Sequence, residues 1–107
     1  MVDTNVKNVS AEEAHKLISG NKEFIILDVR TKGEYDKGHI PGAKLVPVEV
    51  IPTKLAELDK YKDKPILVYC ESGARSPIAV VTLENNDFKN IYHLSDGISS
   101  WRYNVTK

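Results

Sequence analysis

The sequence predicts an α/β domain with a mostly parallel sheet, because short apolar strands alternate with helical segments along its 107 residues. Residues 24–27 and 65–69 are continuous apolar runs, which is typical of parallel strands covered by helices on both faces. Ser10 and Glu13 have the spacing of a capping box, which marks the start of a helix between strands. The chain length is that of one domain, so we expect residues 1–107 to share one core.

Each expected element has a local reason in the sequence. Gly20 is a suitable C-cap for the first helix, and Gly38 together with the Pro41-Gly42 turn ends a short second one. Pro77 falls in the first turn of a later helix, where its missing N–H costs nothing. In chain order we expect an edge strand over 6–9, a helix over 10–20, a strand over 24–27, a short helix over 31–37, a brief strand over 43–46, a weak helix over 53–58, strands over 65–69 and 91–94 on either side of a helix over 76–85, and a closing turn or helix over 98–103.

Composition excludes several functional classes. Fifteen basic residues balance fifteen acidic ones, so net charge gives no support for nucleic-acid binding. The longest apolar runs span four or five residues, far below the roughly 20 that a membrane helix needs. The single cysteine cannot form an internal disulfide, and residues 1–5 are polar, unlike a secretory signal. We therefore expect a cytoplasmic protein without nucleic-acid or membrane partners.

The loop after the strand at residues 65–69 has the composition of an anion site. Cys70 ends the strand, Gly73 permits a tight backbone turn, and a helix begins at Ser76. Inward-pointing amides and the helix N-terminus would lower the pKa of the Cys70 thiol and favour the nucleophilic thiolate. Arg75 adds positive charge, whereas Glu71 opposes it and is expected to point outward or to pair with Arg75.

These residues resemble the active-site loop of the rhodanese family. The resemblance rests on Cys70-x-x-Gly73-x-Arg75-Ser76, on Leu27-Asp28-Val29-Arg30, on Glu34-Tyr35, on Gly38-His39-Ile40-Pro41-Gly42-Ala43, and on Leu94-Ser95-Asp96-Gly97 with Trp101. The motifs occur in the family's order and span nearly the whole chain. The resemblance implies a five-stranded, mostly parallel sheet with helices on both faces. It also implies a rhodanese-type sulfurtransferase that carries sulfur as a cysteine persulfide.

The resemblance assigns roles to individual residues. Cys70 would be the nucleophile, and the substrate-binding loop would consist of Glu71, Ser72, Gly73, Ala74, Arg75 and Ser76. The implied partners are a small sulfur donor, such as thiosulfate, a persulfide or a polysulfide, and a thiol, cyanide-like or protein acceptor. We expect Asp28 and Arg30 to form an internal salt bridge near the site, with Glu34 in the same structural set.

The sequence gives no reason to expect a cofactor or a metal. His15, His39 and His93 lie on different elements without the spacing of zinc ligands, and spacing alone cannot argue for a cysteine–histidine pair. Trp101 is expected to anchor the core.

Two departures from the family pattern qualify the resemblance. Asp96-Gly97 replaces the paired glycines that often occur there, and Glu71 stands where many thiosulfate users have a basic residue. A carboxylate beside the nucleophile would repel the thiosulfate dianion.

Two alternative functions remain open at this stage. A cysteine-dependent phosphatase or arsenate reductase also uses a Cys and an Arg around an oxyanion, but with five residues between them rather than the four present here. A non-catalytic thiol sensor or docking module is the other alternative, because a thiol of low pKa also oxidises readily.

Overall fold

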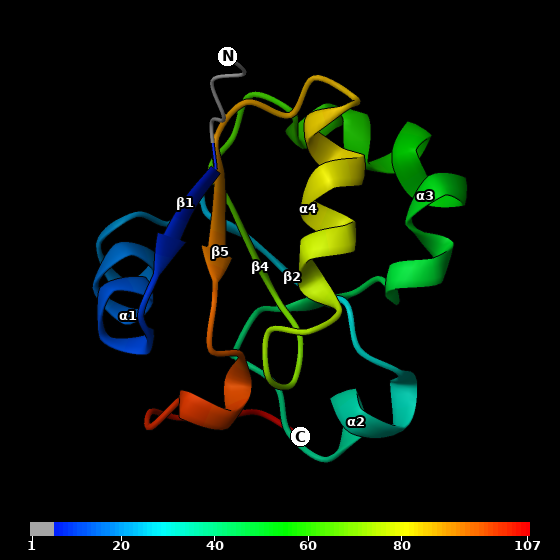
Figure 1. Ribbon diagram of the computed structural model, residues 1–107. Helices are drawn as coiled ribbons and strands as arrows, with labels where there is room; N and C mark the ends of the chain where they lie inside the picture. Colours follow the sequence, from blue (N-terminus) through cyan, green and yellow to red (C-terminus); the bar gives the residue numbers. More distant parts are fainter. Residues whose placement is uncertain (1–5) are drawn as a thin grey trace.

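The computed structural model describes residues 6–107, so the polar segment at residues 1–5 lies outside the described residues (Figure 1). The strands are β1 (Val6–Val9), β2 (Ile25–Asp28), β3 (Lys44–Leu45), β4 (Ile66–Tyr69) and β5 (Ile91–Leu94). The α-helices are α1 (Ala11–Gly20), α2 (Lys32–Asp36), α3 (Ile51–Leu58) and α4 (Ser76–Glu84), and the 3₁₀ helices are η1 (Val48–Val50), η2 (Asp59–Tyr61) and η3 (Ile98–Ser100).

The strands form one five-stranded sheet in the order β1-β5-β4-β2-β3, and every pair of neighbours is parallel. This confirms the predicted fold class. In the central pairs, Leu27 of β2 lies opposite Val68 of β4, and Val68 lies opposite His93 of β5. The carboxyl ends of β2, β4 and β5 therefore meet at one edge of the sheet, where ligands of open α/β sheets bind.

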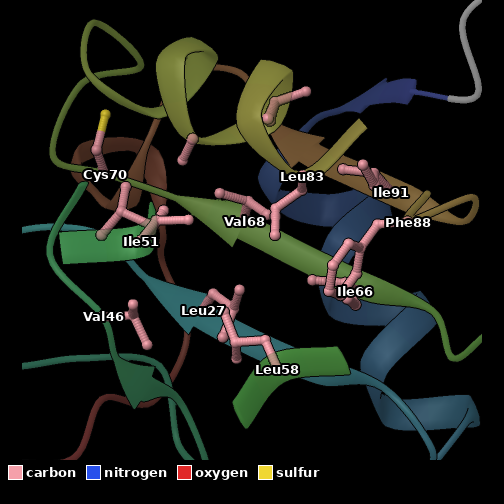
Figure 2. Packing of buried hydrophobic residues seen from close by; sticks show 13 residues of the cluster. Leu27, Val46, Ile51, Leu58, Ile66, Val68, Cys70, Leu83, Phe88 and Ile91 are labelled. Atoms are coloured by element: carbon pink, nitrogen blue, oxygen red, sulfur yellow. The ribbon is translucent and has the colours of Figure 1, made fainter. Parts of the chain in front are cut away.

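Helices cover both faces of the sheet, as the sequence predicts (Figure 1). One apolar cluster joins the sheet to α3 and α4, with Leu27, Ile51, Val68 and Leu83 fully buried (Figure 2). A second cluster joins the opposite face to α1 and includes Ala14, Leu67 and Leu94. Trp101 packs against this second cluster, so its predicted role in the core is confirmed.

The local signals set most element boundaries. The capping box of Ser10 and Glu13 is present, since each side chain accepts a hydrogen bond from the other's backbone N–H. Gly20 is the last helical residue rather than the C-cap, a position that Asn21 occupies. Helix α3 begins earlier than expected, at Ile51, because Pro52 fits the first turn of the helix rather than ending the preceding connection.

The closing segment forms only the short 3₁₀ helix η3. Among residues 6–107, no helix combines the length and the apolar character needed to cross a bilayer.

Candidate active site

The loop between β4 and α4 packs against the loop that follows β5. The backbone N–H groups of Ile98 and Ser99 donate to the carbonyl oxygens of Cys70 and Glu71, each at 3.0 Å. Gly73 has φ +95°, and a Cβ at this position would overlap the carbonyl oxygen of Ser95. The loop therefore has one close-packed shape that requires glycine at position 73.

Gly97, in the loop after β5, packs against the cysteine loop from the other side. Its φ is +71°, and a Cβ there would overlap the carbonyl oxygen of Glu71. The Asp96-Gly97 turn thus needs glycine only at its second position, because Gly97 and not Asp96 has a positive φ.

The sulfur of Cys70 is surrounded by hydrogen-bond donors. The amides of Gly73 and Ser76 point at Sγ from 3.1 and 3.4 Å, and the Ser76 hydroxyl oxygen lies 3.3 Å away. Burial raises the pKa of the Cys70 thiol, but the bonds from the Ser76 hydroxyl and from the amides of Ser76, Arg75 and Gly73 outweigh it and lower the pKa below its ordinary value. The loop therefore favours a thiolate.

The thiol is nevertheless buried. Cys70 has 0% exposure, and its side chain extends from the core cluster, with the sulfur directed toward the loop (Figure 2). Ser72 and Ala74 are exposed on the outer side of that loop. Sγ is therefore covered in this conformation of the loop.

Arg75 binds a carboxylate rather than the cysteine. Its Nη1 and Nη2 donate to the two oxygens of Glu34 at 2.9 and 2.8 Å, which is a bidentate ion pair. The bond from Arg75 is the main reason that the pKa of Glu34 is lowered, to about 2. Because Glu34 balances the charge of Arg75, the thiolate depends mainly on amides and on Ser76, and less on Arg75 than the sequence suggested.

Asp28 and Arg30 form a buried ion pair at the end of β2, of the kind the sequence predicts. Arg30 Nη2 lies 2.6 Å from Asp28 Oδ2, and Arg30 Nε is 2.9 Å from Oδ1. The Tyr69 hydroxyl donates to Asp28 at 2.7 Å and accepts from the amide of Ile40. The pair thus joins β2, β4 and the loop before β3.

Glu71 lies partly exposed and binds Arg30, with 3.1 Å between Oε1 and Nη1. Glu71 is therefore exposed, as one of the two expected alternatives has it, but its ion-pair partner is Arg30 rather than Arg75. The physical reason is that Glu34 already accepts from both terminal nitrogens of Arg75, while Nη1 of Arg30 is directed toward Glu71.

The charged side chains around the loop are mostly paired with one another. Two arginines, Arg30 and Arg75, are paired with three carboxylates, Asp28, Glu34 and Glu71. A cavity of about 440 Å³ opens beside the loop and adds Lys37 to this set. A second cavity, of about 490 Å³, lies between α1 and the C-terminal segment and contains no residue of the cysteine loop.

The structure also places a histidine at the site, which the sequence analysis did not assign. His93 Nε2 lies 2.6 Å from Ser76 Oγ, and His93 Nδ1 lies 3.0 Å from Asn8 Oδ1. The available signal was a polar residue within an apolar strand, since a buried imidazole needs partners. Among the described residues no group of three or more His, Cys, Asp or Glu side chains is arranged to hold a metal ion.

Comparison with known proteins adds independent support. The family model of the rhodanese-like domain matches residues 10–104. A protein named sulfurtransferase from Allochromatium vinosum is 30% identical over 96 residues, covering 90% of this chain and 88% of that protein.

Solved structures agree with the fold. A crystal structure of a protein from Staphylococcus saprophyticus has a TM-score of 0.83 at 26% identity and covers 94% of this chain and 99% of that chain. A rhodanese-like domain protein from Staphylococcus aureus has a TM-score of 0.79 at 32% identity, covering 89% and 90%. The sheet order, the cysteine loop and the match to residues 10–104 lead to one conclusion: the chain belongs to the rhodanese-like domain family.

Proposed function

We propose that the protein is a sulfurtransferase that carries a sulfane sulfur on Cys70. In the first step the Cys70 thiolate attacks the outer sulfur of a donor, an S–S bond forms, and the donor's own bond to that sulfur breaks with its electron pair on the leaving group. In the second step a thiol or cyanide-like acceptor attacks the outer sulfur of the persulfide, and Cys70 leaves as the thiolate. No net oxidation is needed.

The observation that carries this proposal is the arrangement of donors around Sγ. The amides of Gly73 and Ser76 and the Ser76 hydroxyl surround one sulfur atom within 3.1 to 3.4 Å. Such a ring stabilises a single negative charge on the thiolate that attacks the donor and that leaves again after transfer. The match to the rhodanese-like domain family supports the same chemistry.

The charges around the loop favour a donor of low charge. Arg30 and Arg75 are already paired with carboxylates, so they attract a dianion such as thiosulfate only weakly, and the Glu71 carboxylate beside the nucleophile repels it. A persulfide or a neutral polysulfide brings less charge to the loop. We therefore place persulfides and polysulfides ahead of thiosulfate as donors.

Neither alternative function has comparable support. A phosphatase needs an arginine that is free to bind the phosphate, whereas Arg75 gives both of its outer nitrogens to Glu34, and the loop has four residues between Cys70 and Arg75. A thiol sensor would need the same reactive Cys70, but no feature of the site is specific to sensing, whereas the match to the rhodanese-like domain family supports sulfur transfer.

Intact-mass spectrometry tests the proposal. After incubation with glutathione persulfide or polysulfide, the protein should gain the mass of one sulfur atom, and dithiothreitol should remove it. Because the chain has one cysteine, Cys70→Ser is a complete control and should gain nothing. Failure of every donor class to add sulfur to folded wild-type protein would refute the proposal.

A further inference from the structure

A chain of four side chains leads from the nucleophile into the sheet. Cys70 Sγ lies 3.3 Å from Ser76 Oγ, Ser76 Oγ lies 2.6 Å from His93 Nε2, and His93 Nδ1 lies 3.0 Å from Asn8 Oδ1. Asn8 lies on β1 directly opposite His93 on β5, and Ser76 is the first residue of α4. Ser76 is fully buried and His93 is 7% exposed, so water does not compete for the bonds at Ser76, whereas Asn8 at the outer end of the chain is exposed.

The partners decide where the protons lie. Asn8 Oδ1 is an acceptor, so His93 Nδ1 carries a proton and the Nε2 of the neutral imidazole has a lone pair. The Ser76 hydroxyl then donates to Nε2, and its oxygen accepts from the thiol of Cys70. Every group in the chain has a partner while the thiol is protonated.

A thiolate changes this balance. Sγ and a neutral Nε2 would then be two acceptors on either side of Ser76, whose hydroxyl has one proton. If the imidazole is protonated at Nε2, it donates to Ser76 Oγ, and the Ser76 hydroxyl is free to donate to Sγ. The thiolate and the imidazolium therefore satisfy the chain together.

We propose that His93, acting through Ser76, takes up the proton that Cys70 loses when it becomes the nucleophile. The S–H bond breaks, its proton moves to Ser76 Oγ, and the former hydroxyl proton of Ser76 moves to His93 Nε2. One proton passes in total from sulfur to imidazole, and no electrons are exchanged. When an acceptor removes the sulfur, the same path can return the proton to Cys70. His93 is a positioning residue because it does not touch the sulfur.

The surroundings of His93 allow it to act as this proton store. The residue opposite His93 on β1 is Asn8, and the residue opposite it on β4 is Val68. The charged Lys7, next to Asn8 on β1, lies over the Tyr92 ring. Among the described residues His93 has no ion-pair partner, and the charged loop residues Glu71 and Arg75 are paired with Arg30 and Glu34. Burial lowers the pKa of His93, and a thiolate at Cys70 opposes this shift because it favours the protonated imidazole.

The test is NMR titration of the three histidine rings in wild-type protein and in Cys70→Ala. The expected result is that His93 titrates about one pH unit higher in the wild type, a tenfold difference in proton affinity, because the thiolate favours its protonated form. His15 and His39 serve as internal controls and should not change. An equal His93 midpoint in both proteins would overturn the proposal.

Iodoacetamide alkylation of Cys70 against pH gives a second readout. His93→Gln keeps a hydrogen-bonding side chain but cannot take up a proton, so the alkylation midpoint should rise by about one pH unit. His39→Gln, which removes a histidine of similar burial, should match the wild type. A purely structural role predicts that His93→Gln matches the wild type, and that result would also overturn the proposal.

The inference rests on the proposed function for its purpose but not for its test. Both titrations use the free thiol and need no sulfur donor. A protein that never gains sulfur but shows the coupled titration would refute the sulfurtransferase proposal alone, whereas normal persulfide formation with uncoupled titration would refute the relay alone.

Discussion

Replacing Asp28 with asparagine should leave a buried charge without its partner. Asp28 is 0% exposed and accepts hydrogen bonds from Arg30 Nε and Nη2, from the Arg30 amide and from the Tyr69 hydroxyl. The asparagine has the same size but no charge, so the Arg30 guanidinium, which is 3% exposed, keeps only Glu71 at the surface as a counter-charge. Breaking such a buried pair by removing one partner costs about 3–5 kcal/mol.

Thermal and urea unfolding, followed by circular dichroism, measure this loss. With about 4 °C of Tm per kcal/mol for a domain of this size, the expected drop in Tm is roughly 12–20 °C. Asp36→Asn is a matched control, because the ion pair of Asp36 with Lys32 at 2.7 Å is exposed to solvent and should contribute little to stability. The reasoning is wrong if Asp28→Asn loses no more stability than this control.

Three further predictions concern the loop. Gly73→Ala should raise the alkylation midpoint of Cys70 and destabilise the protein by about 1–3 kcal/mol, because its Cβ meets the Ser95 carbonyl oxygen; unchanged alkylation and unfolding would contradict the close packing. Glu34→Gln should be less stable than the wild type near pH 6, since the pKa of Glu34 is lowered to about 2. The difference in stability should shrink as the pH falls from about 5 toward 2, and urea unfolding that shows a difference independent of pH would rule this out. Glu71→Arg should increase thiosulfate turnover at low ionic strength and lose most of that gain in high salt. Glu84→Arg, at the far end of α4, should leave thiosulfate turnover unchanged, and steady-state kinetics with equal effects for both variants would refute the role of charge at the loop.

The parts of the fold that depend on local sequence could be predicted. Ser10 and Glu13 cap α1 through bonds within one turn, and the apolar run of β4 needs no partner to be recognised as a buried strand. The position of Cys70 and the need for Gly73 in the loop also follow from the order of strand, loop and helix.

The parts that depend on distant contacts could not be predicted. Glu71 meets Arg30, and Arg75 meets Glu34, each across 41 positions of sequence, and which arginine binds which carboxylate depends on how the loops pack. His93 reaches Ser76 only because β5 lies beside β4 in the sheet, so no spacing in the sequence connects it with Cys70.

Single-turnover sulfur transfer tests the central claim most directly. Wild-type protein that has been loaded with persulfide and freed of donor is mixed with cyanide, and thiocyanate is counted against protein. The account predicts one thiocyanate per chain, loss of the added sulfur mass from Cys70, and no thiocyanate from Cys70→Ser treated in the same way. Thiocyanate in equal amounts from the serine variant, or a loaded Cys70 that keeps its sulfur in the presence of cyanide, would contradict it.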